Sequence, residues 1–374
     1  MLGPFYADVE KKQINYRGNK IFLPRENILS PQKIGTDRIS VLLNQKEIWE
    51  ALLVIDHYVN HLIIDFFDKH DAFWVDVPLL TRSISSPGYL TEEHKIITDV
   101  RPFKLQYTDS EIEIFLSQSS QFYLEAYLLL LPELARGVYT IGKSFRNEES
   151  DFRHLAEFRH AEFEFFGDLE AIISLQEQLI LFLLENIISS HYDKLLLFLD
   201  EHEIKNMSNW KPPFLRITFY EAMKELYNLT QDKSYLDGDT ASFNSFAEIA
   251  LHQALGENKP IFVLYYPWHD VAFYHAILPK DTSLAINADL LFPGFGEIIG
   301  SGERLHTFDD YLLKRDTFDL DPRDYDWYGE LRKVSTATHS GFGLGIERFL
   351  TFLLKLPHIK HSVAFPRTSS IFRP

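Results

Sequence analysis

The chain has 374 residues, of which 54 are acidic, 37 are lysine or arginine and none is cysteine, giving a formal net charge of −17. The absence of cysteine excludes disulfides, thiolate zinc sites and cysteine nucleophiles, and it favours a cytoplasmic protein. The acidic balance disfavours a protein whose main task is to grip nucleic acid, so we expect no DNA partner.

The first 38 residues are polar and rich in turn-forming residues, and they predict an N-terminal arm or hairpin rather than an independent domain. They contain no basic region followed by an apolar run, so we expect no secretory signal. The run that comes nearest to a membrane span, residues 179–189, is shorter than the roughly 20 apolar residues that a span needs. We therefore expect no membrane partner.

The remaining residues predict helices and short strands. Apolar residues at helical spacing predict a long helix over residues 44–70, and strands are predicted over residues 72–80, 112–120, 137–145 and 162–166. A second long helix is predicted over residues 169–192, followed by a weakly patterned stretch, residues 200–260, that predicts exposed connections or a small insertion. Further strands are predicted over residues 259–268, 271–278 and 284–292, and a helix over residues 345–356. Helices against a large, mostly antiparallel sheet define an α+β fold class.

The segment from Phe145 to Phe158 gathers groups that suit a nucleotide. Arg146 lies at the end of a predicted strand, where its planar guanidinium could bind a phosphate. Arg153 and His154 add donors, Phe158 offers a flat face for a base, and a carboxylate such as that of Glu162 could bind an ammonium. An equally consistent interpretation is a hairpin whose charges form surface ion pairs.

Two later segments add a glycine-rich turn and a carboxylate pair. Glycines alternate just before the helix that carries Arg348, and such a turn lets an anion approach a helix N-terminus, although a strand packed tightly under a helix has the same pattern. Asp289 and Glu297 could hold Mg²⁺, and Arg304 could clamp a carboxylate, although a loop with solvated charges would also fit. Together the three segments suit activation of a carboxylic acid by ATP, which gives an acyl-adenylate and pyrophosphate.

These segments resemble the sequence motifs of class II aminoacyl-tRNA synthetases. Residues 145–158 resemble motif 2, "GFGLGIER" resembles motif 3, and residues 56–80 resemble motif 1, the helix and strand of the dimer interface. "SSQFYLEAY", "GEIIGSGER", "WYGELRK" and "AFPRTSS" appear in the family's order and are closest to the asparaginyl and aspartyl branch. The resemblance implies a class II catalytic domain over residues 39–374, a homodimer, and the cofactors ATP and Mg²⁺.

The resemblance also implies roles for individual residues. Arg146, Arg304 and Arg348 would be catalytic. The ATP site would comprise Arg146, Glu148, Arg153, His154, Phe158, Glu297, Gly345 and Arg348. The amino acid substrate would be bound by Ser119, Gln121, Glu125, Glu162, Arg304 and Gly341, and the metal by Asp289 and Glu297. Leu124 and Glu125 stand where aspartyl enzymes place a lysine, which favours an amide substrate over aspartate.

Departures from the family pattern concern the acyl acceptor. The 38 residues before the catalytic part are too few for the family's anticodon-binding barrel, and Glu149 and Asp151 place two carboxylates in a loop that meets tRNA in synthetases. His269 and His275 stand where relatives carry lysine or methionine. We therefore expect an enzyme that activates asparagine, aspartate or a close analogue and transfers the acyl group to a small nucleophile such as ammonia or an amine, with tRNA possible but not favoured. The alternatives are an enzyme that charges tRNA without an anticodon-binding domain of its own, and a non-catalytic binding protein.

Overall fold

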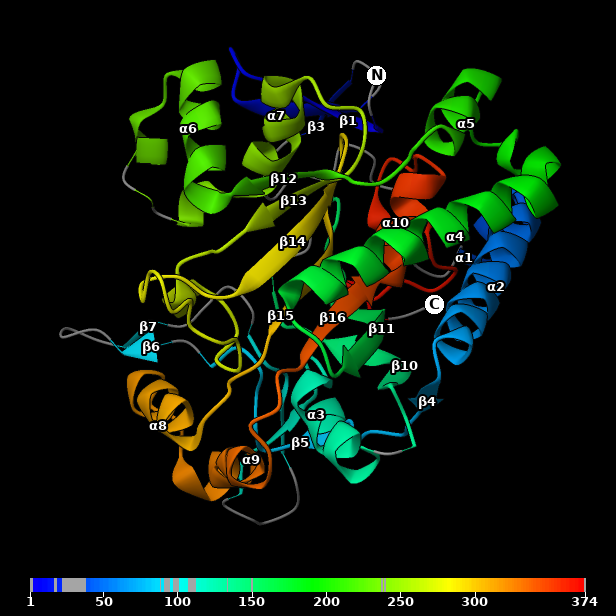
Figure 1. Ribbon diagram of the computed structural model, residues 1–374. Coiled ribbons are helices and arrows are strands. Elements are labelled where there is room, and N and C mark those ends of the chain that lie inside the picture. Colours follow the sequence, from blue (N-terminus) through cyan, green and yellow to red (C-terminus); the bar gives the residue numbers. More distant parts are fainter. Residues whose placement is uncertain are drawn as a thin grey trace.

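The computed structural model describes residues 3–16, 19–21, 38–87, 89–90, 95–96, 101–106, 112–132, 134–148, 151–236, 238 and 240–372. Its centre is an eight-stranded sheet in the order β12-β13-β14-β15-β16-β11-β10-β4 (Figure 1). The strands are β12 (Leu215–Thr218), β13 (Ile261–Leu264), β14 (Asn287–Phe292), β15 (Gly296–Glu303), β16 (Ser340–Gly345), β11 (Glu157–Phe165), β10 (Gly137–Phe145) and β4 (Ala72–Trp74). The inner pairs are antiparallel, and the edge pairs β12–β13 and β10–β4 are parallel. This sheet with its flanking helices confirms the predicted α+β class.

Two long helices pack together beside the sheet and supply much of the core. They are α2 (Lys46–Lys69) and α4 (Leu169–Leu195), both close to their predicted bounds. Phe67 of α2 stacks on Phe163 of β11 with ring centroids 4.9 Å apart. Contrary to our expectation, α4 is long and apolar enough to cross a membrane by length and composition. However, 56% of its most apolar window is buried inside the fold, as in the core helix of a globular protein.

Residues 200–260 are ordered elements rather than the exposed connections that we expected. They form α5 (Glu201–Ser208), β12, α6 (Phe219–Thr230) and α7 (Ser245–Leu255), with 3₁₀ turns at Lys233–Leu236 and Thr240–Ser242. Asp200 and Thr218 each begin a helix with a reciprocal capping box. Both helices are short, and their capping residues mark where they begin.

The predicted strand over residues 271–278 is wrong. This segment is a loop between β13 and β14 that contacts neighbouring strands through separate hydrogen bonds, including Ala276 N to the Glu303 carbonyl at 2.8 Å. Apolar spacing cannot distinguish such a buried loop from a strand. The loop matters because it forms one wall of the cavity described below.

The remaining elements are not part of the eight-stranded sheet. They are β1 (Phe5–Asp8), β2 (Gln13–Tyr16), β3 (Asn19–Ile21), α1 (Arg38–Asn44), β5 (Leu80–Thr81), β6 (Tyr89–Leu90), β7 (Lys95–Ile96), β8 (Lys104–Leu105), β9 (Ile114–Leu116), α3 (Gln121–Leu130), α8 (Phe308–Thr317), α9 (Pro322–Val334), α10 (Ile346–Leu353) and 3₁₀ turns at Trp268–Asp270 and Ile359–His361. The first three strands form their own small sheet, which contacts the rest of the fold through Phe5 N and the Gly294 carbonyl at 2.9 Å. The predicted boundary at residue 38 stays a prediction, because residues 22–37 lie outside the described residues.

Candidate functional site

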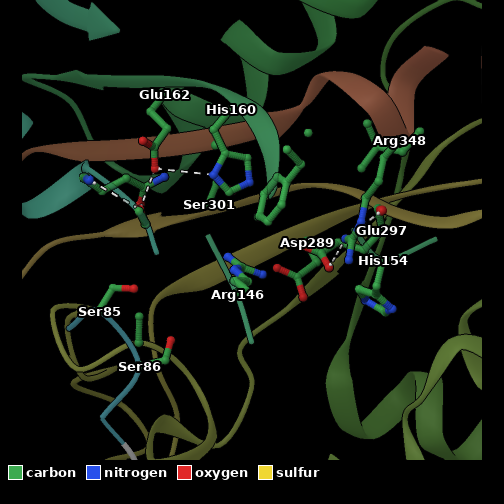
Figure 2. A pocket seen from close by; sticks show the side chains of 18 of the residues that line it. Ser85, Ser86, Arg146, His154, His160, Glu162, Asp289, Glu297, Ser301 and Arg348 are labelled. Atoms are coloured by element: carbon green, nitrogen blue, oxygen red, sulfur yellow. Dashed lines mark hydrogen bonds and ion pairs between the residues drawn. The ribbon is translucent and has the colours of Figure 1, made fainter. Parts of the chain in front are cut away.

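A cavity of about 220 Å³ lies on the sheet and collects most of the predicted site residues (Figure 2). The residues come from four strands, from the segments between them and from the start of α10, so distant parts of the sequence meet here. The predicted residues that line it are Ser119, Gln121, Arg146, Glu148, Arg153, His154, Phe158, Glu162, Asp289, Glu297, Gly345 and Arg348. Three predicted substrate residues, Glu125, Arg304 and Gly341, do not line it.

Strand β11 supplies one wall through its alternating side chains. Phe158, His160 and Glu162 share the face toward the cavity, as expected for every second residue of a strand. The Arg146 guanidinium lies 5.3 Å from the centroid of the Phe158 ring, so a cation and an aromatic face meet at the same place. Our sequence reasoning missed His160, although its spacing from Phe158 and Glu162 predicts the same face.

The opposite face of β11 ties the strand to two helices. Arg159 donates from Nε to Glu347 Oε1 of α10 at 2.7 Å, and its Nη2 lies 2.9 Å from Asp56 Oδ1 of α2. Its backbone N–H also donates to Glu347 Oε2 at 2.8 Å. Arg159 therefore holds α2 and α10 against the back of the cavity wall.

Two carboxylates and a guanidinium meet between β14, β15 and α10. Arg348 Nη1 donates to Glu297 Oε2 at 2.8 Å. Burial opposes ionisation of Glu297, but Arg348 and then Arg153 override it and lower its pKa to about 2. Burial, followed by repulsion from Glu297 and Glu248, raises the pKa of Asp289 well above its usual range.

The same carboxylates fit a divalent cation. A Cβ atom at Gly300 would lie 3.1 Å from Glu297 Oε1 and 3.5 Å from Asp289 Oδ1, so both side chains reach over the same glycine. Oxygen donors are the ligands that Mg²⁺ prefers. No group of three or more His, Cys, Asp or Glu side chains that could hold a metal occurs among the described residues. A cation here would thus need further oxygens from a bound phosphate.

Arg153, which we expected in the ATP site, is held by a protein carboxylate. Its Nη2 donates to Glu248 Oε1 at 2.7 Å, and the side chain is 6% exposed. Glu248 also accepts from the Glu297 backbone N–H at 2.7 Å, so it organises the metal corner. Sequence reasoning missed Glu248, because it lies on α7 in the segment that we took for an exposed connection.

In the loop of motif 2, the carboxylate of Asp151 does not point outward. Asp151 Oδ1 lies 2.7 Å from His154 Nδ1 and accepts from the Arg153 backbone N–H at 2.8 Å. Burial works against ionisation, but His154 and Arg153 hold the pKa of Asp151 below its usual range. Asp151 therefore stabilises the loop, and it does not present the repulsive charge that we expected there. Glu149 lies outside the described residues.

Glu162 lies in the cavity away from Arg348 and Glu297 (Figure 2). It accepts hydrogen bonds from Ser119 Oγ at 2.5 Å and from the Ser120 backbone N–H at 2.9 Å. Burial raises the pKa of Glu162 in spite of these donors. A buried carboxylate that borders a cavity is a suitable partner for an ammonium group.

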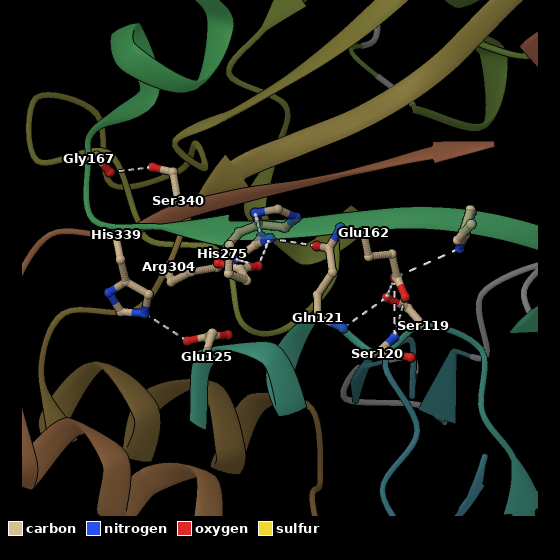
Figure 3. A network of polar contacts seen from close by, with 12 residues as sticks. Ser119, Ser120, Gln121, Glu125, Glu162, Gly167, His275, Arg304, His339 and Ser340 are labelled. Atoms are coloured by element: carbon tan, nitrogen blue, oxygen red, sulfur yellow. Dashed lines mark hydrogen bonds and ion pairs between the residues drawn. The ribbon is translucent and has the colours of Figure 1, made fainter. Parts of the chain in front are cut away.

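The three predicted substrate residues that do not line the cavity form a buried layer behind it. Arg304 is fully buried; its Nε donates to Glu164 Oε1 at 2.9 Å and its Nη2 to Gln121 Oε1 at 2.6 Å (Figure 3). A Cβ atom at Gly341 would lie 2.0 Å from Glu164 Oε1, so this glycine makes room for the Glu164 carboxylate. The geometry therefore does not favour direct contact of Arg304 or Gly341 with the substrate.

Glu125 belongs to a second buried network. Its Oε2 accepts from Arg332 Nη2 at 2.8 Å and lies 2.9 Å from His339 Nε2, and the Tyr328 hydroxyl donates to it at 3.0 Å. Burial opposes its charge, but Arg332 and His339 lower the pKa of Glu125. We predicted that Glu125 contacts the substrate. Its position instead lets it hold α3, α9 and the residue before β16 together.

A family model described as tRNA synthetases class II (D, K and N) matches residues 34–369. The asparagine–tRNA ligases of Pyrococcus abyssi and Thermococcus kodakarensis are 37% and 36% identical to the chain over 275 residues, which are 73% of its length. The chain spans 60% and 61% of the length of these two curated relatives.

Solved structures give the same family. Asparaginyl-tRNA synthetase from Pyrococcus horikoshii, complexed with asparaginyl-adenylate, has a TM-score of 0.79 at 29% identity and covers 97% of this chain and 79% of its own. The enzyme of Entamoeba histolytica, also with asparaginyl-adenylate, has a TM-score of 0.75 at 27% identity and covers 95% and 74%.

These relatives overturn one expectation about the acyl acceptor. We expected a small nucleophile such as ammonia or an amine in place of tRNA, but the curated relatives above are ligases that join asparagine to tRNA. That expectation was wrong. One of the observations that supported it, the outward charge of Asp151, is also absent, because the carboxylate is bound within its own loop.

Proposed function

Since the chain belongs to the class II tRNA synthetases of the D, K and N group, we propose that it activates asparagine with ATP and transfers the aminoacyl group to tRNA. One observation carries the activation step. Arg146 after β10 and Arg348 of α10 line one cavity together with the Phe158 ring. Within the described residues, the buried Nε of Arg146 has no hydrogen-bond partner, which leaves a donor for a phosphate oxygen.

The proposed reaction has two steps. In the first, an oxygen of the asparagine carboxylate attacks the α-phosphorus of ATP, the bond to the bridging oxygen breaks, and pyrophosphate leaves. In the second, a ribose hydroxyl of tRNA attacks the acyl carbon, AMP leaves with the electron pair of the broken bond, and the hydroxyl proton is released. Both steps build negative charge on phosphate oxygens, which fixed guanidinium groups stabilise.

We assign the roles of the lining residues from their positions in the cavity. Arg146 would bind the α-phosphate, Arg348 an outer phosphate, and Phe158 would stack on adenine. Glu162 would bind the ammonium of the amino acid. Asp289 and Glu297 would hold Mg²⁺, which supplies charge neutralisation on the phosphates when it is bound.

Two further proposals concern the state of the protein. We propose a cytoplasmic homodimer whose interface includes α2, β4 and the end of α3. The support is the exposed apolar surface there, which includes Trp74 at 58% and Leu130 at 73% exposure.

The activation step is tested by exchange of labelled pyrophosphate into ATP, with each standard amino acid in turn. We expect exchange with asparagine, and loss of exchange in Arg146→Ala. The transfer step is tested by charging of purified tRNA with labelled asparagine. If none of the amino acids supports exchange, the activation step is contradicted. If asparagine supports exchange but no tRNA is charged, the transfer step alone is contradicted.

A further inference from the structure

His275 occupies a corner of the cavity that the proposed function does not yet use. It lies in the loop between β13 and β14 and is 8% exposed. It lines the cavity together with Gln121, Tyr274 and Ser301. Glu162 is assigned to the substrate ammonium and Arg146 to the α-phosphate, so this corner is where the substrate side chain would extend.

The neighbouring residues fix the position of the His275 imidazole. Its Nδ1 lies 3.4 Å from Arg304 Nη1 (Figure 3). A Cβ atom at Gly302 would lie 2.2 Å from that same Nδ1 and 2.9 Å from the Ile286 carbonyl oxygen, so the imidazole packs directly over a bare glycine of β15. A guanidinium can only donate, so Nδ1 must accept and its proton must be absent. The ring facing the cavity is therefore a neutral imidazole with its proton on Nε2.

The charges around His275 keep it neutral. Burial, followed by the cations Arg304 and Lys314, lowers the pKa of His275 well below its usual range, and the Glu303 backbone only partly opposes them. The nearby cation Arg304 is matched by the Glu164 carboxylate, with which it shares a buried ion pair. Burial lowers the pKa of Lys314, the other nearby cation, to about 7. The corner therefore favours an uncharged side chain over a carboxylate, which would lose its water on entry.

We propose that His275 is a specificity-determining residue, whose neutral imidazole against Arg304 sets the preference for an uncharged amide side chain over a carboxylate. This inference rests on the proposed function, because it assumes that the amino acid binds with its ammonium at Glu162. It assigns Arg304 to a positioning role, since that guanidinium holds both Gln121 and His275 without reaching the cavity itself.

The test compares kcat/KM for asparagine and aspartate in pyrophosphate exchange. His275→Lys places a cation in the corner and is expected to lower the asparagine-to-aspartate ratio at least about tenfold. His275→Gln is the matched control, because it stays neutral and keeps a hydrogen-bonding amide; its activity should fall while the ratio stays within about threefold. Gly302→Ala displaces the imidazole from Arg304 Nη1, which frees that charged donor toward the corner, so the ratio should fall as well.

The outcomes separate the inference from the function. Wild-type exchange with asparagine, together with an unchanged ratio in His275→Lys and Gly302→Ala, would overturn the inference and leave the function standing. Wild-type exchange with aspartate in preference to asparagine would overturn both. Thermal unfolding checks that each variant is folded, and if one is not, the ratio measured on the other decides.

Discussion

Arg348 in the first turn of α10 donates to the Glu297 carboxylate of β15 at 2.8 Å, so two motifs separated by 51 positions share one ion pair. Next to this pair, burial, followed by repulsion from Glu297 and Glu248, raises the pKa of Asp289. A bound metal and a bound triphosphate would both act on this arrangement, which gives the first two predictions.

Replacing Arg348 by alanine should lower kcat/KM for ATP by roughly 10²- to 10³-fold, because a fixed charge on the phosphates is lost. Pyrophosphate exchange at saturating asparagine measures the change. Arg323→Ala is the control: its side chain is 81% exposed and paired with Asp321 outside the cavity lining, so exchange should stay near wild type. A loss below threefold in Arg348→Ala would show that Arg348 does not contact ATP.

Magnesium should stabilise the protein through Asp289, and more strongly at higher pH. The folded-state pKa of Asp289 lies above its unfolded value, so its contribution to stability is present at low pH and is lost as pH rises through the raised pKa. A bound Mg²⁺ would offset both the burial of the charged Asp289 and its repulsion by Glu297 and Glu248, which together cause this loss. We expect Mg²⁺ to raise Tm by about 1–5 °C at mildly alkaline pH and less at acidic pH.

Asp289→Asn is the matched variant for that prediction. It keeps the shape of the side chain but cannot ionise, so its Tm relative to wild type should rise with pH, and its response to Mg²⁺ should be small. Differential scanning fluorimetry of both proteins across pH, with and without Mg²⁺, measures the two effects. An equal response to Mg²⁺ in both proteins would place the metal elsewhere.

Phe158 should contribute to ATP affinity only through the aromatic face of its ring. Phe158→Ala removes the aromatic face beside Arg146 and should raise KM for ATP roughly tenfold, since stacking on a base is worth about 1–3 kcal/mol. Phe158→Tyr retains the face and should change KM little. The same increase in both variants would mean that the position acts through packing and not through stacking.

Glu125 should be needed for stability more than for activity. Glu125→Ala leaves the Arg332 guanidinium buried without its carboxylate and should cost about 3–5 kcal/mol. The double variant Glu125→Leu, Arg332→Met removes both charges and should lose less. Urea unfolding followed by tryptophan fluorescence compares the midpoints. A double variant that is as unstable as the single one would show that the hydrogen bonds, and not the unmatched charge, carry the effect.

The proposed dimer should depend on the exposed edge strand β4. Trp74→Glu places a charge on its exposed apolar surface and should convert a dimer to a monomer, as measured by light scattering after size-exclusion chromatography. Leu236→Glu is the control, because that leucine is exposed to nearly the same extent, 57%, but lies in the 3₁₀ turn after α6. A wild-type protein with the mass of a monomer would contradict the proposal.

The elements with strong periodicity were predictable from the sequence. The helix around Ile55 and Ile63 and the strands ending at Phe145 and Phe165 follow from apolar spacing alone. The positions of Arg146, Phe158 and Arg348 in one cavity follow from the motif likeness. Short helices and the loop around His275 could not be predicted, because burial there depends on contacts between segments far apart in sequence.

The polar partners behind the cavity were the least predictable part of the site. Glu164 binds Arg304 across 140 positions and Glu248 binds Arg153 across 95, and no local pattern connects the members of either pair. Sequence reasoning could identify the guanidinium groups as suitable for phosphate or carboxylate. It could not tell that protein carboxylates already hold three of them, Arg153, Arg304 and Arg348.

The bridge from Asp56 through Arg159 to Glu347 has a practical consequence. These residues border a crevice on the back of β11 that also includes Lys143, one strand away from Phe158 and His160. The chain has no cysteine, so Lys143→Cys would create its single thiol. A fluorophore attached there would report movement of this wall from outside the cavity, whose lining does not include residue 143.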